Sequence, residues 1–294
     1  MSWRRQGWRI SESLSKGRSC FRTDRESVAI ADTIREHGEQ NCPQDSARQP
    51  PMATSSDHYD SHLGRIYSWM IGDFEAALAR SAAELDAIGL PVVRPGTAID
   101  LGAGIGLHSL PLAQRGFSVT AIDSCRQLLD ELQARSGALP IDTVTADIVE
   151  FPEHVQHPAD VILCMGDTLT HLPDVASAEV LLANAARTLA VGGMFICTFR
   201  DYVSSPLLAE RRFIPVRSDD RRILTCFLEY FDDRVMVHDV LHQWEDGRWR
   251  QTVSSYPKLR LAPNWVASQL MTHGLEVRQF PGPSGMACVV ATRA

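Results

Sequence analysis

The chain has 294 residues, of which 44% are hydrophobic and 22% charged. These fractions are typical of a globular protein that can bury a sizeable core. The net charge of −7 disfavours a nucleic-acid partner. Seven scattered cysteines without a Cys-x-x-Cys pair count against a zinc site or a disulfide framework. These cysteines fit a reducing cytoplasm, so we expect a cytoplasmic protein without a metal ion. No apolar run reaches membrane-spanning length, so we expect no membrane partner.

The first part of the chain differs in composition from the rest. Residues 1–51 are polar, carry charges of both signs and are rich in arginine and serine. Such a segment cannot bury enough apolar surface to fold, so we predict a disordered extension. Met52 is a sensible natural start, and its use as such is a hypothesis. The predicted domain covers residues 52–294.

An ordered pattern begins near residue 57. Residues 57–88 show apolar side chains at helical spacing, and Gly89 and Pro91 end this pattern. Strand and helix patterns then alternate, with strands at 97–101, 118–123, 142–147, 159–165 and 193–199, and helices at 108–115, 125–136 and 178–189. Alternation with short links is typical of a parallel sheet covered on both faces. The carboxyl ends of the strands then share one edge, where ligands bind.

After Arg200 the period changes from helical to alternating. Segments 223–231, 235–244 and 249–256 are rich in β-forming residues and are separated by turn signals. We expect residues 203–260 to form an antiparallel β cover inserted after the fifth strand. A helix at 264–274 and two closing strands at 276–280 and 287–293 follow. The predicted fold class is α/β: a doubly wound, mainly parallel, Rossmann-like sheet of seven strands with this insertion.

A glycine-rich loop follows the first predicted strand. Gly102, Gly104 and Gly106 alternate with Ala103 and Ile105, so the bare backbone can approach a ligand closely. Dinucleotide-binding enzymes use G-x-G-x-x-G, and the glycine that this register needs is replaced by Leu107. A loop that binds S-adenosylmethionine has no pyrophosphate to receive. In that interpretation Asp100, at the strand end, helps to receive the ammonium group through water.

Two further acidic residues end the next strands. Asp123 follows the second strand, where a carboxylate can accept both ribose hydroxyls. Asp147 ends the third strand and can receive the adenine amino group, while Ile148 packs on the adenine face. A single strand-end aspartate often serves only as a helix N-cap. Three of them at successive strands, together with the glycine loop, favour a cofactor site.

The motifs resemble those of the class I S-adenosylmethionine-dependent methyltransferases over about residues 57–294. Some segments resemble the glycine and sarcosine N-methyltransferases within that superfamily: GLHSLPLAQRGFSVTAID, DVILCMGDTLTHLPD, LAVGGMFICTFRDY and KLRL. The resemblance implies cofactor contacts from a set of residues along the predicted edge: Tyr59, Asp100, Gly102, Ala103, Gly104, Asp123, Ser124, Asp147, Ile148, Met165 and Gly166.

The same resemblance implies where the methyl acceptor binds. In the glycine enzymes an arginine after the fifth strand holds the substrate carboxylate, and Arg200 falls there. Asp167 stands where that family has an amide, which favours an acceptor with a positive charge or several hydroxyls. His171 is the candidate base for a hydroxyl acceptor. Structural alternatives are an N-cap for Asp167, a backbone contact for His171, and an ion pair of Arg200 with Asp201 or Asp167.

The sequence therefore predicts an enzyme that transfers a methyl group from S-adenosylmethionine to a small amine or an amino-acid-like molecule. Two other functions stay open: a non-catalytic protein that binds the cofactor, and an NAD-dependent oxidoreductase. Methylation of nucleic-acid bases is disfavoured, because the residues after the fourth strand lack an Asn/Asp-Pro-Pro-aromatic run. The identity of the acceptor and the oligomeric state are not predicted.

Overall fold

The structure is a computed structural model that describes residues 54–90 and 96–294. The predicted extension 1–51 and the hypothesis on Met52 lie outside these residues. The described chain begins with short helical segments and one long helix: α2 (Ser55–His58), the π-helix η1 (Tyr59–Leu63), α3 (Gly64–Ile71) and α4 (Phe74–Ile88). The side chain of Asp73 caps α4 by accepting the N–H of Ala76, and Gly89 ends the helix with a φ of 80°.

The main sheet has seven strands: β1 (Gly96–Leu101), β2 (Phe117–Asp123), β3 (Ile141–Thr145), β4 (Ala159–Cys164), β5 (Leu189–Phe199), β10 (Leu275–Pro281) and β11 (Ala287–Arg293). Their order is β10-β11-β5-β4-β1-β2-β3. The first five strands pair in parallel, and β11 runs antiparallel to both β5 and β10. The predicted fold class is confirmed.

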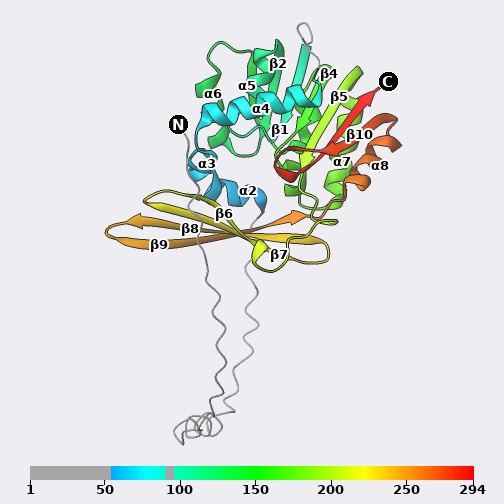
Figure 1. The fold of residues 1–294 in the computed structure, drawn as a ribbon. Helices are drawn as coiled ribbons and strands as arrows, with labels where there is room; N and C mark the ends of the chain where they lie inside the picture. The colour runs from blue at the N-terminus through cyan, green and yellow to red at the C-terminus, as the bar shows by residue number, and fades with distance from the viewer. Residues whose placement is uncertain (1–53, 91–95) are drawn as a thin grey trace, which may run out of the picture. The chain divides into compact units, whose positions relative to one another are not determined.

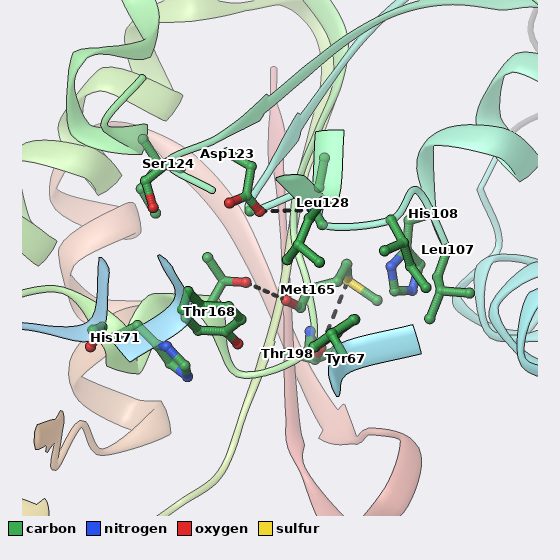
Figure 2. A pocket seen from close by; sticks show the side chains of 18 of the residues that line it. Tyr67, Leu107, His108, Asp123, Ser124, Leu128, Met165, Thr168, His171 and Thr198 are labelled. Atoms are coloured by element: carbon green, nitrogen blue, oxygen red, sulfur yellow. Dashed lines mark hydrogen bonds between the residues drawn. The ribbon is translucent and has the colours of Figure 1, made fainter. Parts of the chain in front are cut away.

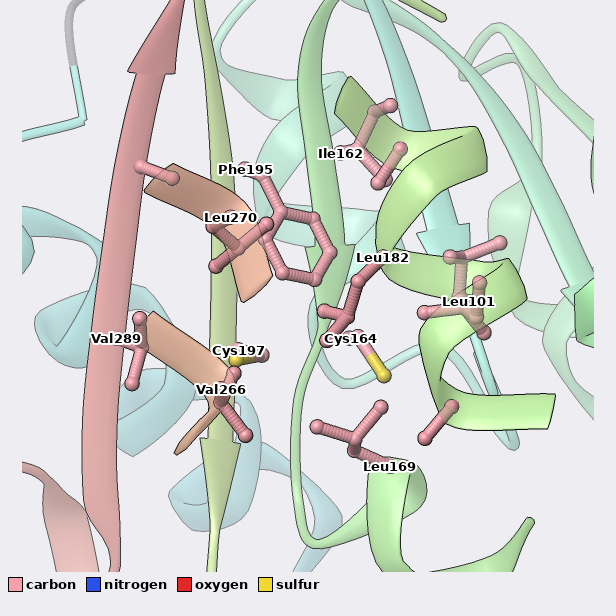
Figure 3. Packing of buried hydrophobic residues seen from close by; sticks show 14 of the residues in the cluster. Leu101, Ile162, Cys164, Leu169, Leu182, Phe195, Cys197, Val266, Leu270 and Val289 are labelled. Carbon is pink, nitrogen blue, oxygen red and sulfur yellow. The ribbon is translucent and has the colours of Figure 1, made fainter. Parts of the chain in front are cut away.

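Helices cover both faces of this sheet (Figure 1). The connecting helices are α5 (Ser109–Gln114), α6 (Arg126–Ser136), α7 (Val175–Thr188) and α8 (Pro263–Thr272). On one face, Leu182 of α7 and Leu270 of α8 belong to the same buried cluster as Phe195 of β5 (Figure 3). On the other face, Leu85 of α4 and Leu112 of α5 belong to a cluster with strand residues. The central strands are therefore buried on both sides, as their continuous apolar sequences require, whereas the edge strands β3 and β10 are more exposed.

A second sheet of four antiparallel strands follows β5: β6 (Phe213–Ser218), β7 (Arg222–Tyr230), β8 (Arg234–Glu245) and β9 (Arg248–Leu259). The last three match the expected β segments. The alternation rule did not predict β6, because its residues are mostly exposed and include Pro215 and Arg217. Short 3-10 helices complete the described chain: η2 (Ile148–His154), η3 (Thr168–His171), η4 (Ala209–Arg212) and η5 (Pro283–Gly285).

The N-terminal helices contact the second sheet through polar side chains. His58 of α2 is fully buried and stacks on Tyr256 of β9 with ring centroids 4.0 Å apart. Its Nδ1 lies 2.7 Å from Ser254 Oγ, and its Nε2 lies 3.2 Å from Asp239 Oδ2. These contacts place α2 beside β9 (Figure 1). Among the described helices, none is long and apolar enough to cross a membrane.

Candidate functional site

A cavity of about 960 Å³ opens at the carboxyl ends of the parallel strands. The order of the sheet reverses beside β1, because β2 and β3 lie on one side of it and β4 and β5 on the other. Ligands bind at such switch points in open α/β sheets. Most of the predicted site residues line the cavity: Tyr59, Gly102, Ala103, Gly104, Asp123, Ser124, Asp147, Ile148, Met165, Gly166 and His171. The other predicted residues, Asp100, Asp167 and Arg200, do not line it.

The three loop glycines have different roles. All three have a positive φ, of 75° at Gly102, 53° at Gly104 and 88° at Gly106. A Cβ on Gly102 would lie 2.4 Å from Thr168 Cγ2, and one on Gly106 would lie 2.1 Å from Leu132 Cδ1. A Cβ on Gly104 would meet only Leu128, at 4.0 Å. Gly104 therefore faces free space in the cavity, which is the cradle that a closely bound ligand needs.

The carboxylate of Asp123 holds the glycine loop from the end of β2. Its Oδ2 accepts the N–H of Gly104 at 2.8 Å, and its Oδ1 accepts the N–H of Cys125 at 2.8 Å. Burial raises the pKa of Asp123, while these two N–H groups oppose the shift. Asp123 lines the cavity (Figure 2), and each of its oxygens can accept one more hydrogen bond. The geometry is compatible with the predicted ribose contact, and that role remains a prediction.

Replacing Asp123 by alanine is expected to weaken binding of S-adenosylhomocysteine by about 2–3 kcal/mol, or about 30- to 150-fold, because charged hydrogen bonds to the ligand are lost. Isothermal titration calorimetry measures this loss. Asp142→Ala is the matched control, since Asp142 is an exposed β3 residue outside the cavity. Equal affinities for the Asp123 and Asp142 variants would remove Asp123 from the binding site.

The other two strand-end acids are placed differently. Asp100 is buried behind the loop, where it accepts a hydrogen bond of 2.6 Å from Ser109 Oγ. It can act on a ligand only across the loop. Asp147 lines the cavity and also caps η2, because its Oδ1 accepts the N–H of Val149 at 2.8 Å. The N-cap alternative thus applies to Asp147, and its second oxygen keeps the adenine role available.

The turn after β4 forms the opposite wall of the cavity. The N–H of Gly166 donates to Thr198 Oγ1 at 2.9 Å, and Thr168 Oγ1 donates to the Met165 carbonyl at 2.8 Å. His171 ends the following 3-10 helix and points into the same cavity (Figure 2). Burial, followed by the charge of Lys258, lowers the pKa of His171 to about 3. Its ring is therefore neutral near pH 7.

Asp167 lies directly behind this wall, and its carboxylate is fully occupied. Oδ2 accepts Lys258 Nζ at 2.6 Å and the Tyr202 hydroxyl at 3.2 Å. Oδ1 accepts the N–H of Arg200 at 2.9 Å and Thr170 Oγ1 at 3.0 Å. Burial opposes ionisation, but the charge of Lys258 and these hydrogen bonds outweigh it and lower the pKa of Asp167.

The structure differs from two expectations about the residues of the acceptor site. The side chain of Asp167 caps no N–H of η3, so the N-cap alternative does not describe it. Arg200 is exposed, and no ion pair joins its guanidinium to a carboxylate within residues 54–90 and 96–294. Sequence reasoning missed Lys258, whose buried cation pairs with Asp167. The available signal was its rarity: Lys16 and Lys258 are the only lysines in the sequence.

Comparison with known proteins adds independent findings. Residues 98–193 match the family described as a methyltransferase domain. The chain is 28% identical over 167 residues to the glycine/sarcosine N-methyltransferase of Aphanothece halophytica, covering 54% of this chain and 62% of that protein. It is 36% identical over 104 residues to the ubiquinone biosynthesis O-methyltransferase of Paramagnetospirillum magneticum, covering 34% and 39%. The matches thus span about three fifths or less of these relatives.

Solved structures extend the similarity to most of the chain. The crystal structure of an S-adenosylmethionine-dependent methyltransferase from Clostridium acetobutylicum superposes with a TM-score of 0.63 and 16% identity, covering 79% of this chain and 98% of that one. At this identity the similarity is one of fold. The resemblance seen in the sequence is confirmed: the chain has the fold of the class I S-adenosylmethionine-dependent methyltransferases, and the methyltransferase domain family matches its residues 98–193, with a glycine/sarcosine N-methyltransferase among its relatives.

Proposed function

We propose that this protein is an S-adenosylmethionine-dependent methyltransferase that acts on a small-molecule amine. The observation that carries the proposal is the cradle over Gly104, which faces free space in the cavity beside the Asp123 carboxylate. Asp147 and Ile148 line the same cavity at the end of the next strand. These residues fit a nucleoside with an amino-acid tail, because they offer carboxylates to its hydroxyl and amino groups and an open backbone to the tail.

When bound, S-adenosylmethionine would supply a methyl group on a positively charged sulfur. The lone pair of the acceptor nitrogen would form the new N–C bond as the S–C bond breaks, and the electron pair of the S–C bond would stay on sulfur. The nitrogen then loses its proton to water. The protein contributes position and exclusion of water. Tyr59 and Tyr67 line the cavity from the N-terminal helices, where they can cover the reacting groups.

The protonation state of His171 favours nitrogen over oxygen as the acceptor. An alcohol needs a general base whose pKa lies near the working pH. His171, with a pKa of about 3, is a weak base. A neutral amine needs no such base. The relatives include both an N- and an O-methyltransferase, so this argument comes from the site itself.

A screen of amines, amino acids and hydroxylated metabolites, scored by release of S-adenosylhomocysteine, tests the proposal. We expect turnover of amines. Cofactor binding without turnover of any acceptor would instead favour the non-catalytic alternative. Turnover of alcohols alone would reject the amine assignment.

The pH dependence of the reaction is a separate prediction. For an amine acceptor, kcat/KM should rise with pH until the ammonium group of the acceptor has lost its proton. His171 should add no step above pH 5, because its pKa of about 3 keeps it neutral there. His171→Asn should lower the rate less than tenfold, whereas loss of a true general base costs about 10²- to 10⁴-fold. A pH step that disappears in the His171 variant would contradict this assignment.

A further inference from the structure

The cavity has an end with no charged side chain. We call it the acceptor end and define it by the lining residues around the turn after β4: Tyr59, Gly166, Thr168, His171, Thr198 and Pro257. Its polar groups are hydroxyls, backbone groups and an imidazole. That imidazole is neutral, because burial and Lys258 keep its pKa low. Among the described residues, this end therefore offers hydrogen bonds but no ionic partner.

A buried ion pair lies directly behind the acceptor end. Asp167 stands between Gly166 and Thr168 in the sequence, and Lys258 follows Pro257. Each charged residue is therefore the immediate sequence neighbour of a residue that lines the cavity. Lys258 Nζ and Asp167 Oδ2 are 2.6 Å apart, and their side chains are 10% and 6% exposed. Each charge alone would act strongly on a ligand in this weakly screened place. Held together, the two charges nearly cancel there.

The nearest arginines do not replace the missing charge. Arg200 occupies the place that the glycine enzymes use for a substrate carboxylate, but it is exposed and does not line the cavity. Arg80 does line it, from α4. The same helix carries Glu84, which lies 3.4 Å from His108, and His108 lies on the other side of Met165 from His171 (Figure 2). Arg80 lies one helical turn before Glu84 on α4 and is not among the residues that define the acceptor end.

We propose that the Lys258–Asp167 pair selects the acceptor: it keeps the acceptor end electrically neutral, so that the site takes amines without a carboxylate beside the nitrogen. This inference rests on the proposed methyltransferase function and narrows its substrate class. A carboxylate that enters this end loses water and gains no cation, which is costly. An amide, hydroxyl or ether in the same place is satisfied by threonine, tyrosine and backbone groups. The chemistry favours amines on uncharged, hydroxylated or amide-bearing molecules.

The test compares two acceptors of nearly equal size, glycinamide and glycine. Methyl transfer from labelled S-adenosylmethionine to each gives kcat/KM, which is corrected for the unprotonated fraction of each amine, because an amide lowers the pKa of the neighbouring ammonium group more than a carboxylate does. The ratio of the two corrected values is the readout. The wild-type protein should prefer glycinamide by about tenfold or more, the effect of one poorly compensated charge at partial burial. A ratio of one, or a preference for glycine, overturns the inference and leaves the proposed function intact. Transfer to neither amine, while other amines of the screen are methylated, overturns the inference, because glycinamide meets its stated acceptor chemistry. Transfer to no amine of the screen rejects the proposed function itself.

Charge variants separate selection from a structural role. Asp167→Asn leaves Lys258 unbalanced, so the preference for glycinamide should fall by about tenfold. Lys258→Met leaves Asp167 unbalanced, and the preference should rise. The double variant is neutral again and should recover the wild-type ratio, which keeps the test decisive if a single variant folds poorly. A purely structural pair would lower both rates alike, and an unchanged ratio in all three variants would overturn the proposal.

A control comes from another ion pair in the same domain. Arg115 Nη2 lies 2.6 Å from Asp86 Oδ1, and neither residue lines the cavity. Arg115→Met removes a cation, as Lys258→Met does, but the carboxylate left behind is exposed, because the Asp86 side chain is 73% exposed. It is expected to lower stability without changing the ratio for glycinamide and glycine. A shift in this control equal to that of the Lys258 variant would also count against the inference.

Discussion

Replacing Lys258 by methionine is expected to lower the free energy of unfolding by about 3–5 kcal/mol at pH 7. The cause is the carboxylate that stays behind. Asp167 is 4% exposed, and without Lys258 its charge has no cation at hydrogen-bonding distance. Three neutral donors remain around it, which compensate a buried charge only in part. Chemical denaturation of the two proteins measures the difference.

The pH dependence identifies this cause. In the wild type the folded pKa of Asp167 is lowered, so its contribution is present above the unfolded pKa of about 4 and is lost as the pH falls through the folded value. In Lys258→Met, burial without a cation raises the folded pKa, so the contribution is lost as the pH rises through it. The deficit of the variant should therefore shrink between pH 7 and pH 4.

The double variant Lys258→Met/Asp167→Asn completes the cycle. It should be more stable than Lys258→Met alone, since it leaves no buried charge. The two groups are not coupled in the folded protein if two results are found together. The double variant would lose as much free energy of unfolding as the two single variants combined, and the deficit of Lys258→Met would be the same at pH 4 and pH 7.

The second large effect is expected from Gly102→Ala. The added Cβ would lie 2.4 Å from Thr168 Cγ2, and the φ of 75° disfavours any residue with a side chain. The conformation costs about 1–2 kcal/mol and the overpacking about 1–3 kcal/mol, so stability should fall by about 2–5 kcal/mol. Displacement of Thr168 would also disturb the turn that Met165 and Gly166 form. Thermal unfolding without ligand measures the loss.

Gly104→Ala is the matched comparison for Gly102→Ala. The two residues share the loop and a positive φ, but a Cβ on Gly104 meets only Leu128 at 4.0 Å. Its stability should fall by only about 1–2 kcal/mol. Binding of S-adenosylhomocysteine should fall much more, because the methyl group occupies the cradle. Equal losses of stability in the two variants, with intact binding in Gly104→Ala, would place the ligand elsewhere.

Much of the fold follows from local patterns in the sequence. All seven strands of the main sheet were predicted: the central parallel strands, such as β1 and β4, are buried apolar runs, and the helices between the strands have a clear period. The glycine loop and Asp123 were recognisable because strand ends bring such residues to one edge. The exposed strand β6 has no such pattern, and the π-helical turn η1 has no known sequence signal that distinguishes it from an α-helix.

The charge of the acceptor end could not be predicted from the sequence. Asp167 suggested a free negative charge, and only the fold shows that Lys258, 91 positions later, cancels it. The two residues come from the turn after β4 and from β9, which belong to different sheets. Local periodicity carries no information about such a pairing. For the same reason, the exposure of Arg200 could not be read from its place after the fifth strand.

The scarcity of lysine turns the buried ammonium of Lys258 into a natural reporter. Lys16 and Lys258 are the only lysines of the chain, and Lys258 is the only one in the described part. An amine-selective acylating reagent can modify Lys258 only when β9 separates from the turn that holds Asp167. The modification rate at this single side chain, followed by peptide mass spectrometry, therefore measures how often the cavity wall opens without any engineered label.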